Sequence, residues 1–270
     1  MPTTVADGVE LYYEREGAGP RLLFVNGSGA TLETSAMLLA PFRARFDVVA
    51  HDQRGLGRTA RPPEPYHMAD YASDAAAVLD AVGWERAAVF GVSFGGMVAQ
   101  ELAVTWPERI ERLVLACTSA GGAAGASYPL HELADMDPTE RAAISARILD
   151  TRFTPEWLAT HDADRALADM MAARQARDAG PDDAERRRGE LAQLEARSRH
   201  DVTDRLGRID CPTLVACGRY DGIAPMANSE AIAARVPGAE LRVYEGGHAF
   251  FAQDPTALPE ILDFLAAGSA

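Results

Sequence analysis

The chain has 270 residues, of which 47% are hydrophobic and 24% are charged, as is ordinary for a globular protein. Its 40 acidic and 26 basic residues give a formal net charge of −14 at pH 7, which argues against nucleic acids and anionic membranes as partners because both bind clustered positive charge. All 26 basic residues are arginine, which excludes a lysine nucleophile, a Schiff base and a P-loop lysine.

The first eight residues have neither a basic start nor an apolar stretch, and no apolar run approaches the ~18–20 residues that span a bilayer. We therefore expect no secretory signal and no transmembrane helix, and we predict a cytoplasmic location. The three cysteines, Cys117, Cys211 and Cys217, show no C-x-x-C spacing. We expect them to be small buried hydrophobic side chains rather than a disulfide framework or a zinc site.

Short apolar runs alternate with helical stretches in the first half of the chain. Residues 9–14 alternate between apolar and polar side chains, which predicts a half-exposed strand at a sheet edge. Unbroken apolar runs, typical of parallel strands covered on both faces, follow at residues 22–25, 47–50, 86–90 and 112–117. Each run ends in a polar or glycine-rich segment, and ligand sites form at that edge of open parallel sheets.

The pattern changes between residues 121 and 208, where no convincing strand is present. Segments rich in alanine, arginine and acidic residues replace the strands. Asp137 and Thr154 each precede a proline and then an acidic residue, as the N-caps of helices do. We predict that this segment is an inserted bundle of about four helices.

The strand pattern resumes at residues 212–217 and 240–244, and a final helix follows Pro255. The expected division is therefore a core domain of residues 1–120 and 209–270, interrupted by the cap at 121–208.

The G-x-S-x-G motif at residues 91–95 places Ser93 between two glycines at a predicted strand-to-helix junction. A nucleophilic serine needs this arrangement, because its side chain must project from a tight turn whose neighbours lack bulk. The N-terminus of the following helix also directs free N–H groups toward an oxyanion. Ser93 is therefore the predicted nucleophile.

A serine hydroxyl needs a base, and the base needs a third group to orient it. Asp221 and His248 follow two successive late strands, each in a glycine-marked turn, and they complete the order serine, acid, histidine. We predict that His248 is the general base and that Asp221 orients it. Asp52 and Asp254 stay open as alternative orienting acids, and the other histidines lack a partnering pattern.

An oxyanion needs two backbone donors beside the nucleophile. The N–H of Phe94 comes directly after Ser93, and a second donor is expected from the glycine-rich loop at residues 26–29. We choose Ser28 in that loop. The loop at residues 26–29 lacks the glycine pattern and the lysine of a phosphate-cradling loop. The predicted catalytic residues and oxyanion donors imply no metal and no organic cofactor.

The chain resembles enzymes of the α/β-hydrolase fold along nearly its whole length. The resemblance rests on five short segments, at residues 26–29, 52–57, 91–96, 218–221 and 246–248. It implies an α/β fold in which a mostly parallel eight-stranded sheet has helices on both faces and an inserted helical cap covers the pocket. The D-x-R-G-x-G segment at residues 52–57 is usually structural in these enzymes, so neither Asp52 nor Arg54 is assigned a role in catalysis.

Asn26 stands where most of these enzymes have a histidine, and the 3-oxoadipate enol-lactonases are similar to this chain in that respect. The resemblance therefore indicates the 3-oxoadipate enol-lactonase and carboxylesterase group. Enol-lactonase substrates are anionic, and Arg54, Arg152 and Arg219 are the candidates to bind such a charge. Serine at position 93, rather than aspartate, separates the chain from haloalkane dehalogenases and epoxide hydrolases of this fold.

These observations predict a serine hydrolase that cleaves a carboxylic ester or lactone through an acyl-enzyme. The predicted pocket includes Asn26, Phe153, Trp157 and Met171, although the three cap side chains also fit a role as the cap's own core. Three alternatives stay open: hydrolysis of a C–C bond in a dienoate or β-diketone, perhydrolase or acyltransferase activity, and ligand binding without turnover. The expected partner is a small-molecule substrate, and a homodimer is left open.

Overall fold

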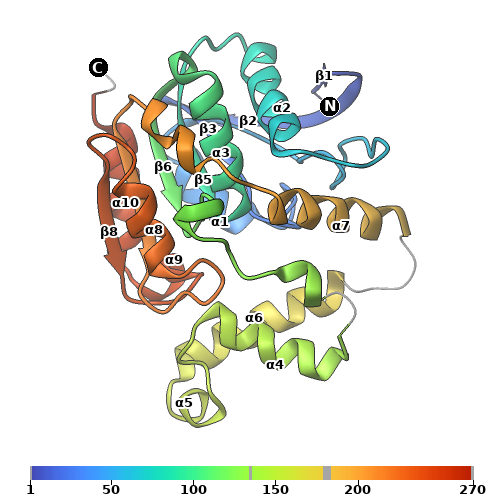
Figure 1. Ribbon diagram of the computed structural model, residues 1–270, viewed down its shortest axis with the longest axis vertical. Coiled ribbons are helices and arrows are strands. Elements are labelled where there is room, and N and C mark those ends of the chain that lie inside the picture. The colour runs from blue at the N-terminus through green and yellow to red at the C-terminus, as the bar shows by residue number, and fades with distance from the viewer. Residues whose placement is uncertain (1, 134–135, 179–183, 269–270) are drawn as a thin grey trace.

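The computed structural model describes residues 2–133, 136–178 and 184–268. One eight-stranded sheet forms its centre, in the order β1-β2-β4-β3-β5-β6-β7-β8 (Figure 1). The strands are β1 (Thr3–Ala6), β2 (Val9–Gly17), β3 (Arg21–Val25), β4 (Asp47–His51), β5 (Ala87–Val92), β6 (Ile110–Ala116), β7 (Thr213–Gly218) and β8 (Glu240–Tyr244). The pairs β1–β2 and β2–β4 are antiparallel and the other five pairs are parallel. The expected α/β class with a mostly parallel eight-stranded sheet is confirmed.

The strand that we expected at the sheet edge lies one position inside it. β2 pairs with β4 on one side and with β1 on the other, so β1 forms the edge. Asp7 and Gly8 join the two strands with φ angles of 47° and 81°, which are those of a tight hairpin turn. The prediction was wrong because a four-residue strand shows too little alternation to recognise, although the Asp-Gly pair was an available turn signal.

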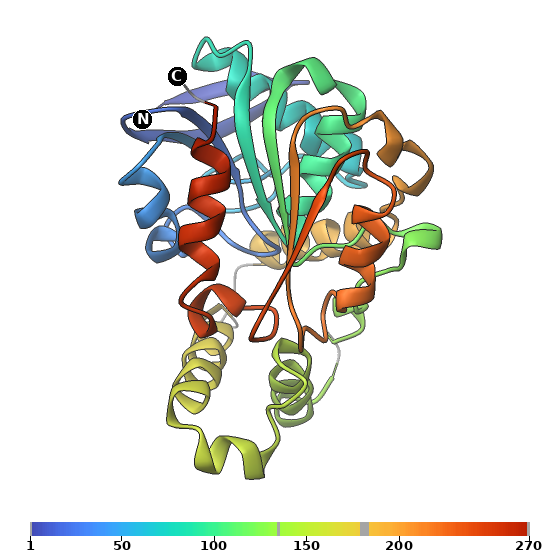
Figure 2. The ribbon, with the colours of Figure 1, turned by 90° about the vertical axis from the view of Figure 1, so that its left-hand side faces the viewer.

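Helices cover both faces of the sheet (Figure 2). On one face lie α2 (Met68–Ala81), α3 (Phe94–Thr105) and α8 (Met226–Ala233), and on the other lie α1 (Ala36–Arg43), α9 (Phe250–Gln253) and α10 (Ala257–Ala266). Successive strand residues enter opposite cores, so that Leu23 packs under the first set of helices and Phe24 under the second. Because both faces of the sheet are covered, apolar residues follow one another along its central strands.

The segment between β6 and β7 is helical, as its sequence indicates. Its α-helices are α4 (Pro138–Leu149), α5 (Pro155–Thr160), α6 (Asp162–Asp178) and α7 (Ala184–Ser198). α4, α5 and α6 form a lobe below the sheet in Figure 1, whereas α7 lies apart from it and against the sheet domain. The backbones of Gly189 in α7 and Gly55 approach so closely that a Cβ on either would clash. The four helices therefore do not form one bundle.

Short 3-10 helices lie in the connecting segments of the described residues: η1 (Pro107–Arg109), η2 (Gly122–Ala124), η3 (Leu130–Leu133) and η4 (Thr203–Arg208). No helix among the described residues is both long enough and apolar enough to cross a membrane. Ser93 follows β5, Asp221 follows β7 and His248 follows β8, so parallel strands bring all three to one edge of the sheet.

Candidate active site

Ser93 lies in a strained turn between β5 and α3. Its φ of 56° and ψ of −117° place a non-glycine residue in the left-handed region. Its N–H donates to the Ala116 carbonyl across 2.8 Å, and the Thr118 hydroxyl donates to the Ser93 carbonyl across 2.7 Å. These bonds stabilise a conformation that presents the serine side chain at the sheet edge.

Ser93, His248 and Asp221 form one chain of hydrogen bonds. Nε2 of His248 lies 3.0 Å from Oγ of Ser93, and Nδ1 lies 2.7 Å from Oδ2 of Asp221. A carboxylate only accepts hydrogen bonds, so Nδ1 carries the hydrogen and Nε2 is left to accept the serine proton. The structure therefore places the three residues in the arrangement that a serine nucleophile requires.

Asp221 is held through both of its carboxylate oxygens. Oδ1 accepts the N–H groups of Ile223 and Ala224, each across 2.8 Å, and the side chain is fully buried. Asp52 and Asp254, the alternative orienting acids, accept backbone N–H groups in other turns. Asp221 is thus the acid that the structure brings to His248.

The predicted oxyanion donors lie beside the serine. No described residue accepts a hydrogen bond from the backbone N–H of Ser28 or of Phe94. The loop that contains Ser28 is close to the serine turn, since a Cβ on Gly27 would lie 3.5 Å from Cβ of Ser93. A Cβ on Gly95 would collide with the Val25 carbonyl, so glycine is what allows α3 to start against this loop.

The cap residues of the predicted pocket share one apolar cluster. Phe153, Trp157 and Met171 pack with one another inside the α4–α6 lobe, and the cluster also reaches Ala249, the neighbour of His248. Trp157 is further engaged by polar contacts, since its Nε1 donates to Asp164 across 2.8 Å. Phe153 thus belongs to the buried core of the lobe, and Trp157 and Met171 are half-buried against that core.

Asn26, the fourth predicted pocket residue, is buried at the end of β3. Its carbonyl accepts a hydrogen bond from Nε2 of Gln53 across 2.6 Å. No described residue accepts a hydrogen bond from its Nδ2. Asn26 therefore lies in the loop beside the serine turn with one amide hydrogen-bonding group unused.

The three arginines considered for an anionic substrate are all engaged by carboxylates of the protein. Arg54 binds Asp74 through two bonds of 2.7 Å, Arg152 binds Asp150 across 2.6 Å, and Arg219 binds Glu245 across 3.1 Å. The structure therefore offers none of them as an uncompensated cation.

Two residues near the site, Arg197 and Gln253, carry no sequence pattern that predicts their role. Arg197, on α7, is 5% exposed and donates to the hydroxyls of Ser28 and Ser127. Its position in a strongly charged helix gave no sign of burial. Gln253 lies five residues after His248, and its role depends on contacts that no motif encodes.

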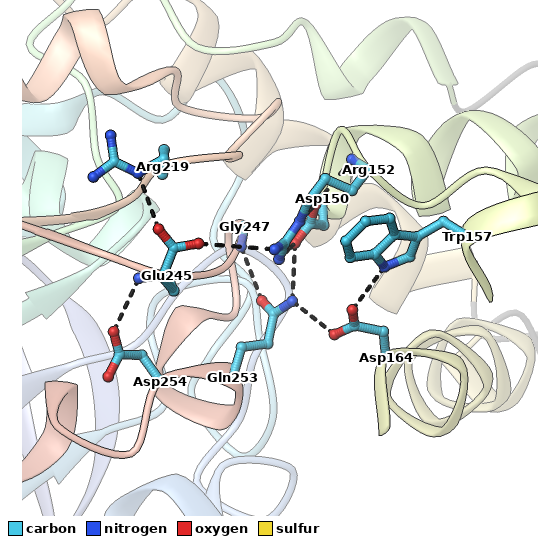
Figure 3. A network of polar contacts seen from close by, with 9 residues as sticks. All are labelled: Asp150, Arg152, Trp157, Asp164, Arg219, Glu245, Gly247, Gln253 and Asp254. Atoms are coloured by element: carbon cyan, nitrogen blue, oxygen red, sulfur yellow. Dashed lines mark hydrogen bonds and ion pairs between the residues drawn. The ribbon is translucent and has the colours of Figure 1, made fainter. Parts of the chain in front are cut away.

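Gln253 is the centre of a polar network that joins the His248 loop to the α4–α6 lobe (Figure 3). Its Oε1 accepts the N–H of Gly247 across 2.9 Å, and its Nε2 donates to Asp150 across 2.9 Å and to Asp164 across 3.1 Å. Gly247 directly precedes His248. The network therefore makes the position of the histidine loop depend on that of the lobe.

One cluster among the described residues has the composition of a metal site, and it coincides with the serine site. Ligand atoms of Cys117, Asp221 and His248 lie within 4.8 Å of one another. Burial raises the pKa of the Cys117 thiol well above its usual value, which leaves the sulfur protonated and a poor ligand. The Asp221 and His248 atoms are already bonded to each other.

The mostly parallel sheet and the serine site at its edge agree with the family that the chain matches. Residues 20–255 match the alpha/beta hydrolase fold family. The chain belongs to this family and is an enzyme of the hydrolase type.

Particular relatives cover nearly the whole chain. A protein of Azorhizobium caulinodans with the provisional name carbamate hydrolase RutD is 30% identical over 97% of each chain. The 3-oxoadipate enol-lactonase 2 of Acinetobacter baylyi is 28% identical, over 94% of this chain and 92% of its own length. The crystal structure of a hydrolase from Pseudomonas aeruginosa PA01 is 32% identical, covers 98% of both chains and superposes with a TM-score of 0.76.

Proposed function

We propose that this hydrolase cleaves a carboxylic ester or a lactone through an acyl-enzyme on Ser93. The observation that carries the proposal is the hydrogen-bond chain from Ser93 through His248 to Asp221, with distances of 3.0 and 2.7 Å. His248 takes the serine proton as Oγ attacks the carbonyl carbon, and Asp221 stabilises the imidazolium that forms. His248 then protonates the leaving alcohol and activates the water that hydrolyses the acyl-enzyme.

The tetrahedral intermediate carries a negative oxygen that needs donors in place before the reaction. The N–H groups of Ser28 and Phe94 are assigned this role because neither donates a hydrogen bond to a described residue and both lie next to the serine turn. Each such donor lowers the barrier by about 2.7–4 kcal/mol in measured cases. No step of this mechanism needs a metal or an organic cofactor.

The relatives support an ester-type substrate. A lactone is a cyclic ester, and a relative named as an enol-lactonase matches 94% of this chain. A carbamate is the second candidate, because a relative named as a carbamate hydrolase matches 97% of it. The substrate is a small molecule in either case, and in this proposal residues 121–208 form the cap over the site.

Substrate panels with wild-type protein and the Ser93→Ala variant test the proposal. The panel contains p-nitrophenyl esters, simple lactones, an aryl carbamate and a vinylogous diketone. We expect turnover of esters and lactones that falls by at least about 10⁴-fold in Ser93→Ala, as after loss of other serine nucleophiles. Ser73→Ala, a change on the exposed face of α2, is the matched control and should keep wild-type rates. Undiminished ester turnover in Ser93→Ala would refute the assignment, and C–C cleavage without ester turnover would replace the substrate class.

A further inference from the structure

Arg197 has a buried charge without an acidic partner. Its Nε donates to Oγ of Ser127 across 3.0 Å and its Nη1 to Oγ of Ser28 across 3.2 Å. Both acceptors are neutral hydroxyls, and none of the described acidic residues forms an ion pair with this guanidinium. Burial lowers the pKa of Arg197 to about 10, so the group stays charged at pH 7. A buried charge left unpaired is costly, and an anion beside it removes that cost.

The charge of Asp221 is close enough to favour the charged form of Arg197 but does not pair with it. Both oxygens of Asp221 are occupied, one by His248 and the other by two backbone N–H groups. Arg197 therefore keeps most of its five N–H donors for another acceptor.

A cavity of about 120 Å³ lies next to Arg197. Its walls include Met97, Ser119, Tyr128, Leu194 and His200, and no described residue of the wall is acidic. Since about 10–15 Å³ of such space is enough to hold one water molecule, the cavity has room for a carboxylate on a short chain. The wall thus combines a cation, hydroxyls and apolar side chains.

His200 adds a second unused polar group to this wall. It is 5% exposed, and neither ring nitrogen forms a hydrogen bond with a described residue. Burial lowers its pKa to about 4, so the ring is neutral at pH 7 and has one N–H to donate. Buried polar groups are ordinarily hydrogen-bonded, and a bound ligand would satisfy this one.

The cavity lies beside the serine site. Arg197 holds the hydroxyl of Ser28, whose backbone N–H is the proposed oxyanion donor. The preceding residue, Gly27, is close enough to Ser93 that its Cβ would lie 3.5 Å from that of the serine. Met97 of the cavity wall is one helical turn beyond Ser93. Arg197 therefore connects the wall of this cavity, through Ser28, to the loop beside the serine.

We propose that Arg197 binds a carboxylate of the substrate, and that the enzyme acts on esters or lactones that also bear a free carboxylate. The planar guanidinium fork fits a carboxylate with two parallel hydrogen bonds, and its single charge matches a monoanion. This inference rests on the proposed function, since the bound group is part of the molecule that acylates Ser93. It also explains why the guanidinium of Arg197 is buried against Ser28, in the loop that supplies the proposed oxyanion donor.

Matched substrates test the inference: monomethyl glutarate, which has one carboxylate, and dimethyl glutarate, which has none. We expect wild-type protein to have the higher kcat/KM for the half-ester. Arg197→Gln should lower that value by about tenfold or more, chiefly through KM, because a charged hydrogen-bond partner is lost. The same variant should change kcat/KM for the diester less than about threefold, since that substrate makes no such contact. Arg187→Gln, an exposed arginine of the same helix, is the control and should behave as wild type.

Equal losses on both substrates in Arg197→Gln, or a wild-type preference for the diester, would overturn the inference. If Arg197→Gln does not fold, competitive inhibition of the wild-type enzyme by glutarate but not by glutaramide is the expected result, and inhibition by neither would overturn it. Ser93→Ala separates the two proposals. Loss of turnover on both esters retains the proposed function whatever the charge preference, and persistent turnover in that variant defeats the function itself.

Discussion

The backbone N–H of His248 donates to the carbonyl of Leu149 across 2.6 Å, which ties the loop of the proposed base to the last residue of α4. The adjacent carbonyl of Ile148 accepts the N–H of Gly222, the neighbour of Asp221, across 3.0 Å. One short segment of the lobe therefore holds both the histidine loop and the acid loop. We expect the geometry of the site to depend on residues that never touch a substrate.

Gln253→Leu tests that dependence. The change removes the hydrogen bonds to Gly247, Asp150 and Asp164 and replaces the amide by an apolar side chain one heavy atom smaller. Because a misplacement of 1 Å can lower catalysis by about 100-fold, we expect kcat to fall by roughly 10- to 100-fold with little change in KM. The measurement is steady-state kinetics on the best ester of the panel.

Arg219→Gln is the control for that variant, because it removes an exposed ion pair of the same network. Exposed pairs contribute about 0–1 kcal/mol, so its kcat should stay within about twofold of wild type. A Gln253→Leu enzyme with unchanged kcat would show that the network does not position His248.

Asp221→Asn should lower kcat by about 10⁴-fold, as the equivalent change does in serine proteases. An amide that donates to Nδ1 of His248 selects the tautomer in which Nε2 carries the hydrogen and no longer accepts the serine proton. Asp254→Asn is the matched control, since Asp254 accepts backbone N–H groups and does not contact the histidine. Comparable losses in the two variants would contradict the orienting role of Asp221.

Arg54→Met should lower the free energy of unfolding by about 3–5 kcal/mol, because it leaves the carboxylate of Asp74 buried without its charge partner. The side chains of Arg54 and Asp74 are 7% and 0% exposed. Urea unfolding measures the loss. Adding Asp74→Leu should recover most of it, since the unpaired charge is then removed as well. Arg15→Gln, at the exposed pair with Asp47, should cost no more than about 1 kcal/mol, and an equal cost at both sites would contradict the argument.

The free energy of unfolding should depend on the protonation of His51. This residue is buried without a hydrogen-bond partner among the described residues, and burial, with the nearby charge of Arg54, lowers its pKa from 6.5 to about 4. Well above pH 6.5 neither state binds the proton, and the residue contributes no pH dependence. Between pH 6.5 and 4 the unfolded chain binds more protons than the native state, so the native state loses stability as the pH falls.

The His51→Gln variant isolates this contribution. Between pH 7.5 and pH 5 the wild-type protein should lose about 2 kcal/mol more of its unfolding free energy than the variant does. Urea unfolding of both proteins at the two pH values gives the difference directly, because other titrating groups are common to both. Identical losses would mean that the pKa of His51 is the same in the native and unfolded states.

Sequence patterns predicted the fold because they record local requirements. Unbroken apolar runs follow from strands that are buried on both faces, and each run named in advance for the parallel sheet corresponds to a strand. The glycines around Ser93 follow from a turn in which helix and loop backbones nearly touch. The edge strand β1 escaped notice because four residues are too few to show a period.

In the candidate site, too, some residues are predicted by local sequence patterns and others are revealed only by contacts between distant segments. Ser93, Asp221 and His248 were recognisable from chain order and turn residues, and the structure brings their side chains together. Arg197 and Gln253 were not recognisable. Their significance depends on partners far away along the chain: Ser28 lies 169 residues from Arg197, and Asp150 lies 103 residues from Gln253.

By itself, then, the sequence determined the parallel strands, the serine turn and the chain order of the three polar residues, since each depends on neighbours close along the chain. Only the tertiary structure decided which charges are neutralised. Arg54, Arg152 and Arg219 each find a carboxylate, whereas Arg197 is buried against hydroxyls. The pairing of a charge depends on what packs beside it, and that is settled when distant segments meet.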